Sequence, residues 1–247
     1  TRILAYVQEK HGDKDPRVLT LRSIISTCEI AEAVMNLLVG AVAMTPLHLA
    51  GTEEAGLRAA IRGTASLSAA LFLPAFIASP AQLLFLAPWT KWLLRNRRYL
   101  GLSFAVSQFT HLGFVLALAA THSASFFARL SRPTLVGGSV GYLFLTLMTA
   151  TSFDRTTAWL GRRRWRLLHG TGVWLLWSIF AFTYLVAAAR GSLTGLFVMP
   201  LAGGVALRVA AAVRRRRDTA ASRANAVAPS ASAGAITSAL DTLRRDP

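Results

Sequence analysis

Apolar residues occur along this chain in six long runs, and polar and basic residues fill the short gaps between them. A helix of about 20 residues crosses the hydrocarbon core of a membrane, and each run reaches that length. The pattern therefore predicts six transmembrane helices, at about residues 25–50, 64–88, 99–121, 134–153, 167–188 and 193–212.

The first predicted helix has the weakest signal of the six. Glu29 and Glu32 lie three residues apart in its opening turns, so they share one helix face. That face is either the interfacial end of the helix or a polar site in the interior of the bundle.

The composition is typical of a membrane protein. Of the 247 residues, 53% are apolar and only 15% are charged, and the mean hydropathy is +0.46. A chain with so little polar surface cannot coat a soluble globule. We therefore expect an all-α membrane protein, a six-transmembrane-helix bundle in the lipid bilayer. The single cysteine, Cys28, cannot form an internal disulfide, which excludes a disulfide framework.

The basic residues favour one orientation in the membrane. A net charge of +16 would indicate nucleic acid in a soluble protein, but here Lys and Arg lie in the gaps between apolar runs. The chain has 27 Lys and Arg residues, and 22 of them fall on the side that holds both termini and the second and fourth connections. The other five are Arg58, Arg62, Arg129, Arg132 and Arg190. Cytoplasmic loops carry such an excess. We therefore expect a multi-pass protein of the bacterial inner membrane with both termini cytoplasmic and no nucleic acid partner.

The ends of the chain differ in composition from its middle. We assign residues 1–24 to a cytoplasmic N-terminal segment, residues 25–213 to the transmembrane domain and residues 214–247 to a basic cytoplasmic tail. The tail has few large apolar residues to bury, so we expect it to be disordered. Neither a GxGxxG segment nor a P-loop is present, and only the polar tail follows the last helix. We therefore expect no flavin or nicotinamide domain in this chain.

Histidines supply the main candidate chemistry. His11 lies in the polar N-terminal region, and His48 and His122 lie at the outer ends of predicted helices, where a ring reaches water. His169 lies just inside the fifth helix. His111 lies ~18 Å along the third helix, near mid-membrane, where an uncommitted imidazole is costly. Either Thr or Ser on a neighbouring helix satisfies it, or it holds haem iron.

Two segments resemble a known family. RRYLGL, followed by HL at His111 and Leu112, and TS…LGRRRWRLLH, ending at His169, occur in order on the third and fifth helices. They resemble the bacterial ferric-reductase-like transmembrane domain, to which the haem-binding membrane subunit of the methionine sulfoxide reductase system belongs. The resemblance covers about residues 60–190. It implies a six-helix bundle that binds b-type haem between these two helices, with His111 and His169 as iron ligands.

The same resemblance implies a function in electron transfer. The chain would be an oxidoreductase subunit that relays electrons through haem b across the membrane to an outer acceptor. Because it has no flavin domain of its own, the donor would be a separate flavoprotein or quinol. Arg163, Arg164 and Arg166 suit haem propionates and lipid headgroups equally well, since a guanidinium binds either anion with a two-pronged fork.

The chain departs from the family at Phe182. Members of the sulfoxide-reductase type carry a further histidine on the fifth helix, thirteen residues beyond the one that His169 matches, and this chain has Phe182 there. Three outcomes stay open. His111 and His169 share one haem, or each holds a haem with another partner, or haem has been lost. In the last case the chain is a haem-free membrane scaffold or a transporter-like protein.

Overall fold

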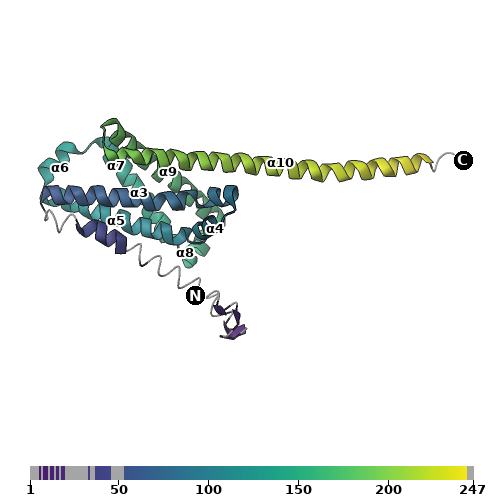
Figure 1. The fold of residues 1–247 in the computed structure, drawn as a ribbon, viewed down its shortest axis with the longest axis horizontal. Coiled ribbons are helices and arrows are strands. Elements are labelled where there is room, and N and C mark those ends of the chain that lie inside the picture. Colours follow the sequence, from purple (N-terminus) through teal and green to yellow (C-terminus); the bar gives the residue numbers. More distant parts are fainter. Residues whose placement is uncertain are drawn as a thin grey trace.

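The computed structural model is built of helices and turns, with no strand in the part of the chain that it describes (Figure 1). It describes residues 6, 8–10, 12, 13, 15, 16, 18, 19, 33, 37–45 and 53–243. For these residues the prediction of an all-α fold is confirmed.

Five segments are long and apolar enough to cross a membrane. They are α3 (Glu54–Phe85), α5 (Arg97–Thr121), α7 (Arg132–Ala150), α9 (Arg162–Ala189) and Leu193–Arg223, in which the short helix η1 (Leu193–Phe197) leads into α10 (Val198–Leu243). These segments match the second to sixth predicted spans and indicate a multi-pass membrane protein. The first predicted span, 25–50, lies mostly outside the described residues, as do Cys28, Glu29 and Glu32.

Three short helices connect the long ones: α4 (Pro88–Arg95), α6 (Ser123–Arg129) and α8 (Asp154–Leu160). Local sequence determines where they begin and end. Pro88 opens α4, at a position where a helix leaves the backbone N–H unused. Gly161, with φ at +78°, joins α8 to α9, because glycine adopts this conformation without steric cost.

The centre of the bundle is α3, which packs against α5 and α10 and reaches α9. Phe72 of α3 contacts Phe104 of α5 and Phe180 of α9, with ring centroids 5.4 Å apart in both pairs. Phe76, one turn further along α3, contacts Arg208 of α10. These phenylalanines are buried and form the middle of the main core.

The outward faces of the long helices are apolar. On α7 five large apolar side chains are exposed: Leu135, Val136, Val140, Leu143 and Leu147. Soluble monomers rarely expose so much contiguous apolar surface. Helices of this length and exposure indicate a lipid environment.

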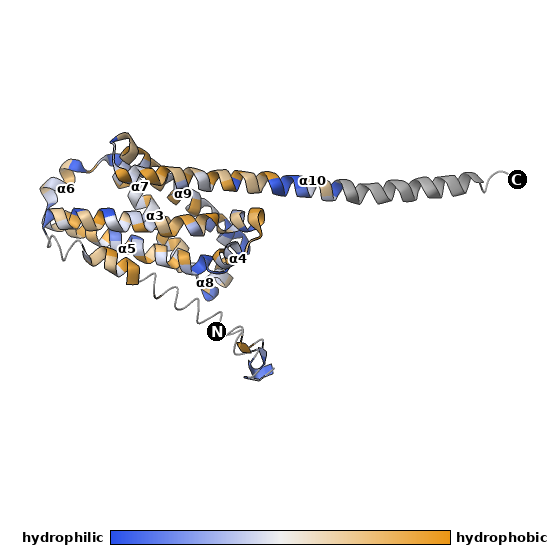
Figure 2. Cartoon of the chain, viewed as in Figure 1, coloured by the Kyte–Doolittle hydropathy of each residue, from blue (hydrophilic) through white to orange (hydrophobic). Residues whose placement is uncertain are grey.

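The two ends of the bundle differ in charge. Arg97 at the start of α5 donates to Ser79 near the end of α3, and Arg214 of α10 donates to the Leu84 carbonyl. The short helices α4 and α8 lie at this end and α6 at the other (Figure 1). Hydrophilic residues gather here and on the first part of α10 beyond the bundle (Figure 2). We call this the basic end; it holds residues 91–98, 155–166 and 208–217.

The structure differs from the predicted boundaries at two places. The helix α3 begins at Glu54 rather than at residue 64, because Arg58 forms an ion pair with Glu54 one turn earlier and continues the helix beyond its apolar run. The helix α10 continues past residue 212, the predicted end of the sixth span, to Leu243. Ala and Arg have high helix propensity, which favours this continuation.

Candidate functional site

His111 lies on the face of α5 that meets α3. Its Nδ1 is 3.1 Å from the Ile61 carbonyl oxygen and 3.2 Å from Thr64 Oγ1. The Thr64 hydroxyl donates to the Ala60 carbonyl at 2.7 Å, so the ring N–H is available for Ile61. Of the alternatives left open by the sequence, a bond to a neighbouring helix is present.

A line of small polar residues continues from His111 along the contact between α3 and α5. Ser107 Oγ lies 2.9 Å from Ser68 Oγ, and the same hydroxyl lies 3.4 Å from the Thr64 carbonyl oxygen. Ser68, Thr64 and Ser107 are fully buried. Small and hydroxyl residues let two membrane helices approach closely and bond to each other. We call Thr64, Ser68, Ser107 and His111 the polar seam.

His169 contacts a different part of the bundle. Its Nε2 lies 3.1 Å from Thr151 Oγ1, just past the end of α7. The Thr151 hydroxyl donates to the Leu147 carbonyl at 2.7 Å, which leaves its oxygen free to accept from the ring. The ring also stacks on Trp165, with centroids 4.3 Å apart, and the Trp165 indole N–H donates to the Thr151 carbonyl.

The structure does not bring His111 and His169 together. The helices α5 and α9 run parallel, since Arg97 lies beside His169 and Phe104 contacts Phe180. His111 lies fourteen residues beyond Arg97 on α5, which is about 21 Å of helix. One haem iron needs both axial nitrogens bonded to it directly. The two histidines therefore do not fit a single shared haem in this arrangement.

The space between α5 and α9, where the resemblance implies a haem, is occupied by side chains. The rings of Phe104 and Phe180 lie 6.0 Å apart, and Phe72 packs against both. Phe182 does not face this space, because its side chain is 57% exposed on the outside of the bundle. At the level of Phe104 and Phe180, these rings lie in the space between the two helices.

A pocket of ≈ 200 Å³ lies at the basic end, between α5, α9 and α10. Its charged and polar lining comes from Arg97, Arg166, His169 and Arg208, and Trp165 and Trp174 supply aromatic walls. Among the residues that the structure describes, no Asp or Glu lines it. We call it the arginine pocket.

Arg208 has aromatic and backbone contacts in this pocket. Its guanidinium carbon lies 3.9 Å from the centroid of the Phe76 ring and 5.5 Å from that of Trp174. One Nη donates to the Phe76 carbonyl oxygen at 2.8 Å, while the buried Nε has no hydrogen-bond partner. The Arg97 guanidinium donates to Ser79 Oγ at 3.0 Å. Neither arginine forms an ion pair with a carboxylate among the described residues.

We did not anticipate the arginine pocket from the sequence. In the sequence, Arg97 and Arg208 were considered only as two of the many basic residues that orient the chain in the membrane. One signal was present, because Arg208 interrupts the apolar run ALRVAAAV, and an arginine inside a membrane helix is costly without a partner.

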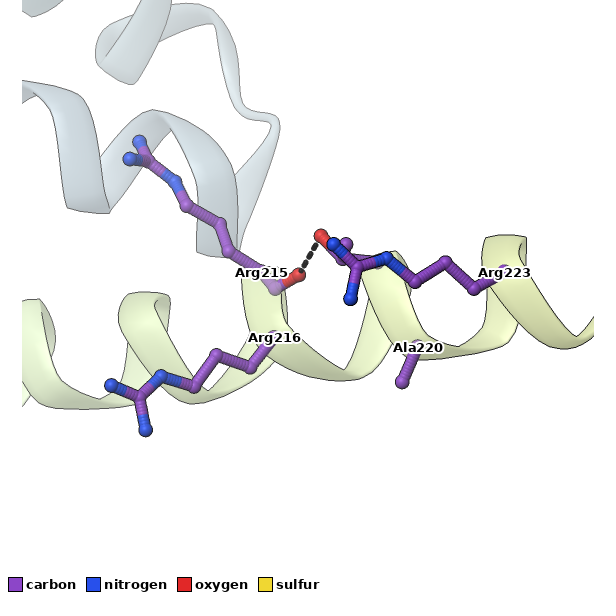
Figure 3. Close-up of a pocket in the computed structure, with 5 residues that line it drawn as sticks. Arg215, Arg216, Ala220 and Arg223 are labelled. Atoms are coloured by element: carbon purple, nitrogen blue, oxygen red, sulfur yellow. Dashed lines mark hydrogen bonds between the residues drawn. The ribbon is translucent and has the colours of Figure 1, made fainter.

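A second hollow, of ≈ 290 Å³, lies along α10 beyond the bundle, beside Arg215, Arg216 and Arg223. The three arginine side chains point in different directions, and the bond drawn joins the Thr219 hydroxyl to the Arg215 carbonyl oxygen within the helix (Figure 3). All three arginines are exposed. This hollow is a solvated face of one helix rather than a site.

His122 lies away from both places. His122 follows α5 at the end opposite the basic end, and its Nδ1 lies 2.8 Å from Thr121 Oγ1. His11 and His48 lie outside the described residues.

A search of protein-family models finds none that matches this chain, and a search of curated proteins finds no match either.

Proposed function

We propose that this chain is a haem-free membrane scaffold built on the ferric-reductase-like plan. The observation that carries the proposal is the packing of Phe72, Phe104 and Phe180, whose rings fill the space where the resemblance implies a haem. Phenylalanine rings in contact stabilise helix packing directly, without a cofactor between them.

The bonds of the two histidines support the same proposal. His111 joins α5 to α3 through Ile61 and Thr64, and His169 joins α9 to the end of α7 through Thr151. The Nε2 of His169, the nitrogen that usually binds haem iron, is engaged with Thr151. Both rings therefore act as polar links between helices.

The second candidate function is the haem b electron-transfer subunit that the resemblance implies. One observation favours it. His111 Nδ1 bonds to the Ile61 carbonyl, which leaves Nε2 as the other ring nitrogen. Metal-bound histidines commonly bind the metal through one ring nitrogen and donate the other N–H to a backbone carbonyl. In that case His111 alone would hold a haem, with a partner other than His169.

Haem content separates the two candidates. The full chain would be produced in bacteria supplied with a haem precursor, purified in mild detergent, and examined by absorption before and after reduction with dithionite. We expect no sharp visible bands and a haem content far below one per chain.

Two histidine variants make the result decisive. Stoichiometric haem that is lost in His111→Ala and kept in His122→Ala would overturn the proposal and favour the electron-transfer subunit. His122 is the matched control because it is also a histidine but lies at the C-terminal end of α5, next to Thr121 and away from the polar seam.

A further inference from the structure

The arginine pocket concentrates positive charge without a counter-charge. Arg97, Arg166 and Arg208 come from three different helices and line one small space, and none of the described carboxylates lines it. Among the described residues of the bundle, Arg58 is paired with Glu54 and Arg98 with Asp154, so this chain does supply acids to other arginines. Buried or half-buried charges in a membrane protein are normally paired. The pocket therefore has the charge that an anion-binding site needs.

The guanidinium of Arg208 is arranged to receive a ligand. Phe76 and Trp174 hold it in place, and its Nε keeps an unused N–H although it is buried. An unpaired buried donor is costly, and an anion that accepts this bond removes the cost. Arg97 has one Nη on Ser79 and further N–H groups that bond no described residue.

The size of the pocket limits the ligand. At ≈ 200 Å³ it holds the equivalent of about six or seven waters at ~30 Å³ each. That is below the range of about 300 Å³ or more that is usual for drug-sized ligands and cofactors. A tetrahedral anion or the headgroup of a larger molecule suits this volume, whereas a whole porphyrin does not.

The pocket opens toward the surface of the bundle at the basic end. Arg166, Gly170 and Trp174 on its α9 side are exposed, whereas Arg97, His169 and Arg208 lie deeper. Arg97 is the first residue of α5, so the pocket lies at the edge of the apolar span rather than at its centre. Tryptophan is enriched at this depth of a membrane, and basic pockets between helices bind anionic headgroups there.

We infer that the arginine pocket binds a phosphate group, either the headgroup of an anionic phospholipid or a free phosphate compound. Arg97 and Arg208 donate to the phosphate oxygens from the inner wall, and Arg166 donates from the rim. Guanidinium forks match phosphate geometry with paired N–H···O bonds. The inference does not depend on whether the chain binds haem elsewhere.

Binding is measured on the purified full chain in neutral detergent. Native mass spectrometry would follow the addition of phosphatidylglycerol, and calorimetry would follow the addition of inorganic phosphate. We expect Arg97→Gln and Arg208→Gln each to weaken binding about tenfold or more, because each removes charge-assisted bonds to the phosphate. Arg95→Gln, at the exposed end of α4, makes the same change in charge at the same end of the bundle and serves as the control.

The outcomes separate the two sources of phosphate. Arginine-dependent binding of phosphatidylglycerol identifies a lipid headgroup, and arginine-dependent binding of inorganic phosphate identifies a free phosphate compound. The inference would be overturned if Arg97→Gln and Arg208→Gln weakened binding no more than Arg95→Gln does. It would also be overturned if the parent protein bound neither probe. Arg166→Gln covers the case in which an inner variant does not fold, because Arg166 is exposed, and we expect it to weaken binding severalfold.

Discussion

At the scale of single residues, the two histidines of the family resemblance have the same kind of role in different places. His111 bonds Ile61 and Thr64 on α3, and His169 bonds Thr151 at the end of α7. Each imidazole is paired with a threonine whose own hydroxyl proton goes to its helix backbone. Polar links of this kind hold membrane helices together where lipid offers no hydrogen bonds.

His111→Ala is expected to lower the stability of the bundle. The substitution removes the bond to Ile61 and leaves a small cavity in the polar seam, a loss of about 1 to 2 kcal/mol. Thermal unfolding in detergent, followed by circular dichroism, would show a lower Tm than that of the parent. His122→Ala, which lies at a helix end, should change the Tm much less. Equal losses in the two variants would contradict a structural role for the polar seam.

At the scale of helices, the runs of apolar residues predicted most of what is observed. Five of the six predicted spans match helices long and apolar enough to cross a membrane, and the other lies mostly outside the described residues. A long apolar run specifies a membrane helix almost independently of its surroundings. Boundaries were less accurate where polar residues extend a helix, as Glu54 and Arg58 do in α3. Side-chain direction was not predicted: Phe180 faces the core whereas Phe182 faces outward. That difference depends on how α9 is rotated against its neighbours.

The connection from α9 to α10 depends on close backbone packing at Gly195. A Cβ there would overlap the backbone of Ala188 at the end of α9. Gly195→Ala should therefore displace η1 and destabilise the bundle by about 1 to 3 kcal/mol, since a backbone clash relaxes poorly. Thermal unfolding in detergent would measure this loss of stability.

Gly203→Ala is the matched control for this change. Gly203 lies on α10, and a Cβ there meets nothing within 4 Å. Alanine also favours the helix over glycine, so this variant should be as stable as the parent or slightly more stable. A Gly195→Ala variant as stable as Gly203→Ala would show that η1 does not pack against α9 in this way.

At the scale of the whole molecule, charge and apolar packing are separated along the bundle. The basic gaps lie together at one end, as the alternation of helices predicted, and the phenylalanine core lies between the ends. The arginine pocket was not predictable from the sequence, because it needs the register of α5, α9 and α10 to bring Arg97, Arg166 and Arg208 together. The spacing of residues within one helix does not predict which residues of different helices lie close together.

The basic end is predicted to face the cytoplasm, by the bias of Lys and Arg. In a Cys28→Ser background, Ser131→Cys before α7 should react with an impermeant maleimide in intact cells. Arg155→Cys on α8, at the basic end, should react only after permeabilisation. The reverse pattern would invert the orientation of the chain.

A crystal structure of the protein, purified from cells supplied with a haem precursor, tests most directly whether the space between α5 and α9 is filled by side chains. We predict that the rings of Phe104 and Phe180 lie in contact with Phe72, as in the present structure, at centroid separations near 6.0 Å and 5.4 Å. Flat porphyrin density between α5 and α9, with these rings displaced and His111 bonded to iron, would contradict a haem-free scaffold.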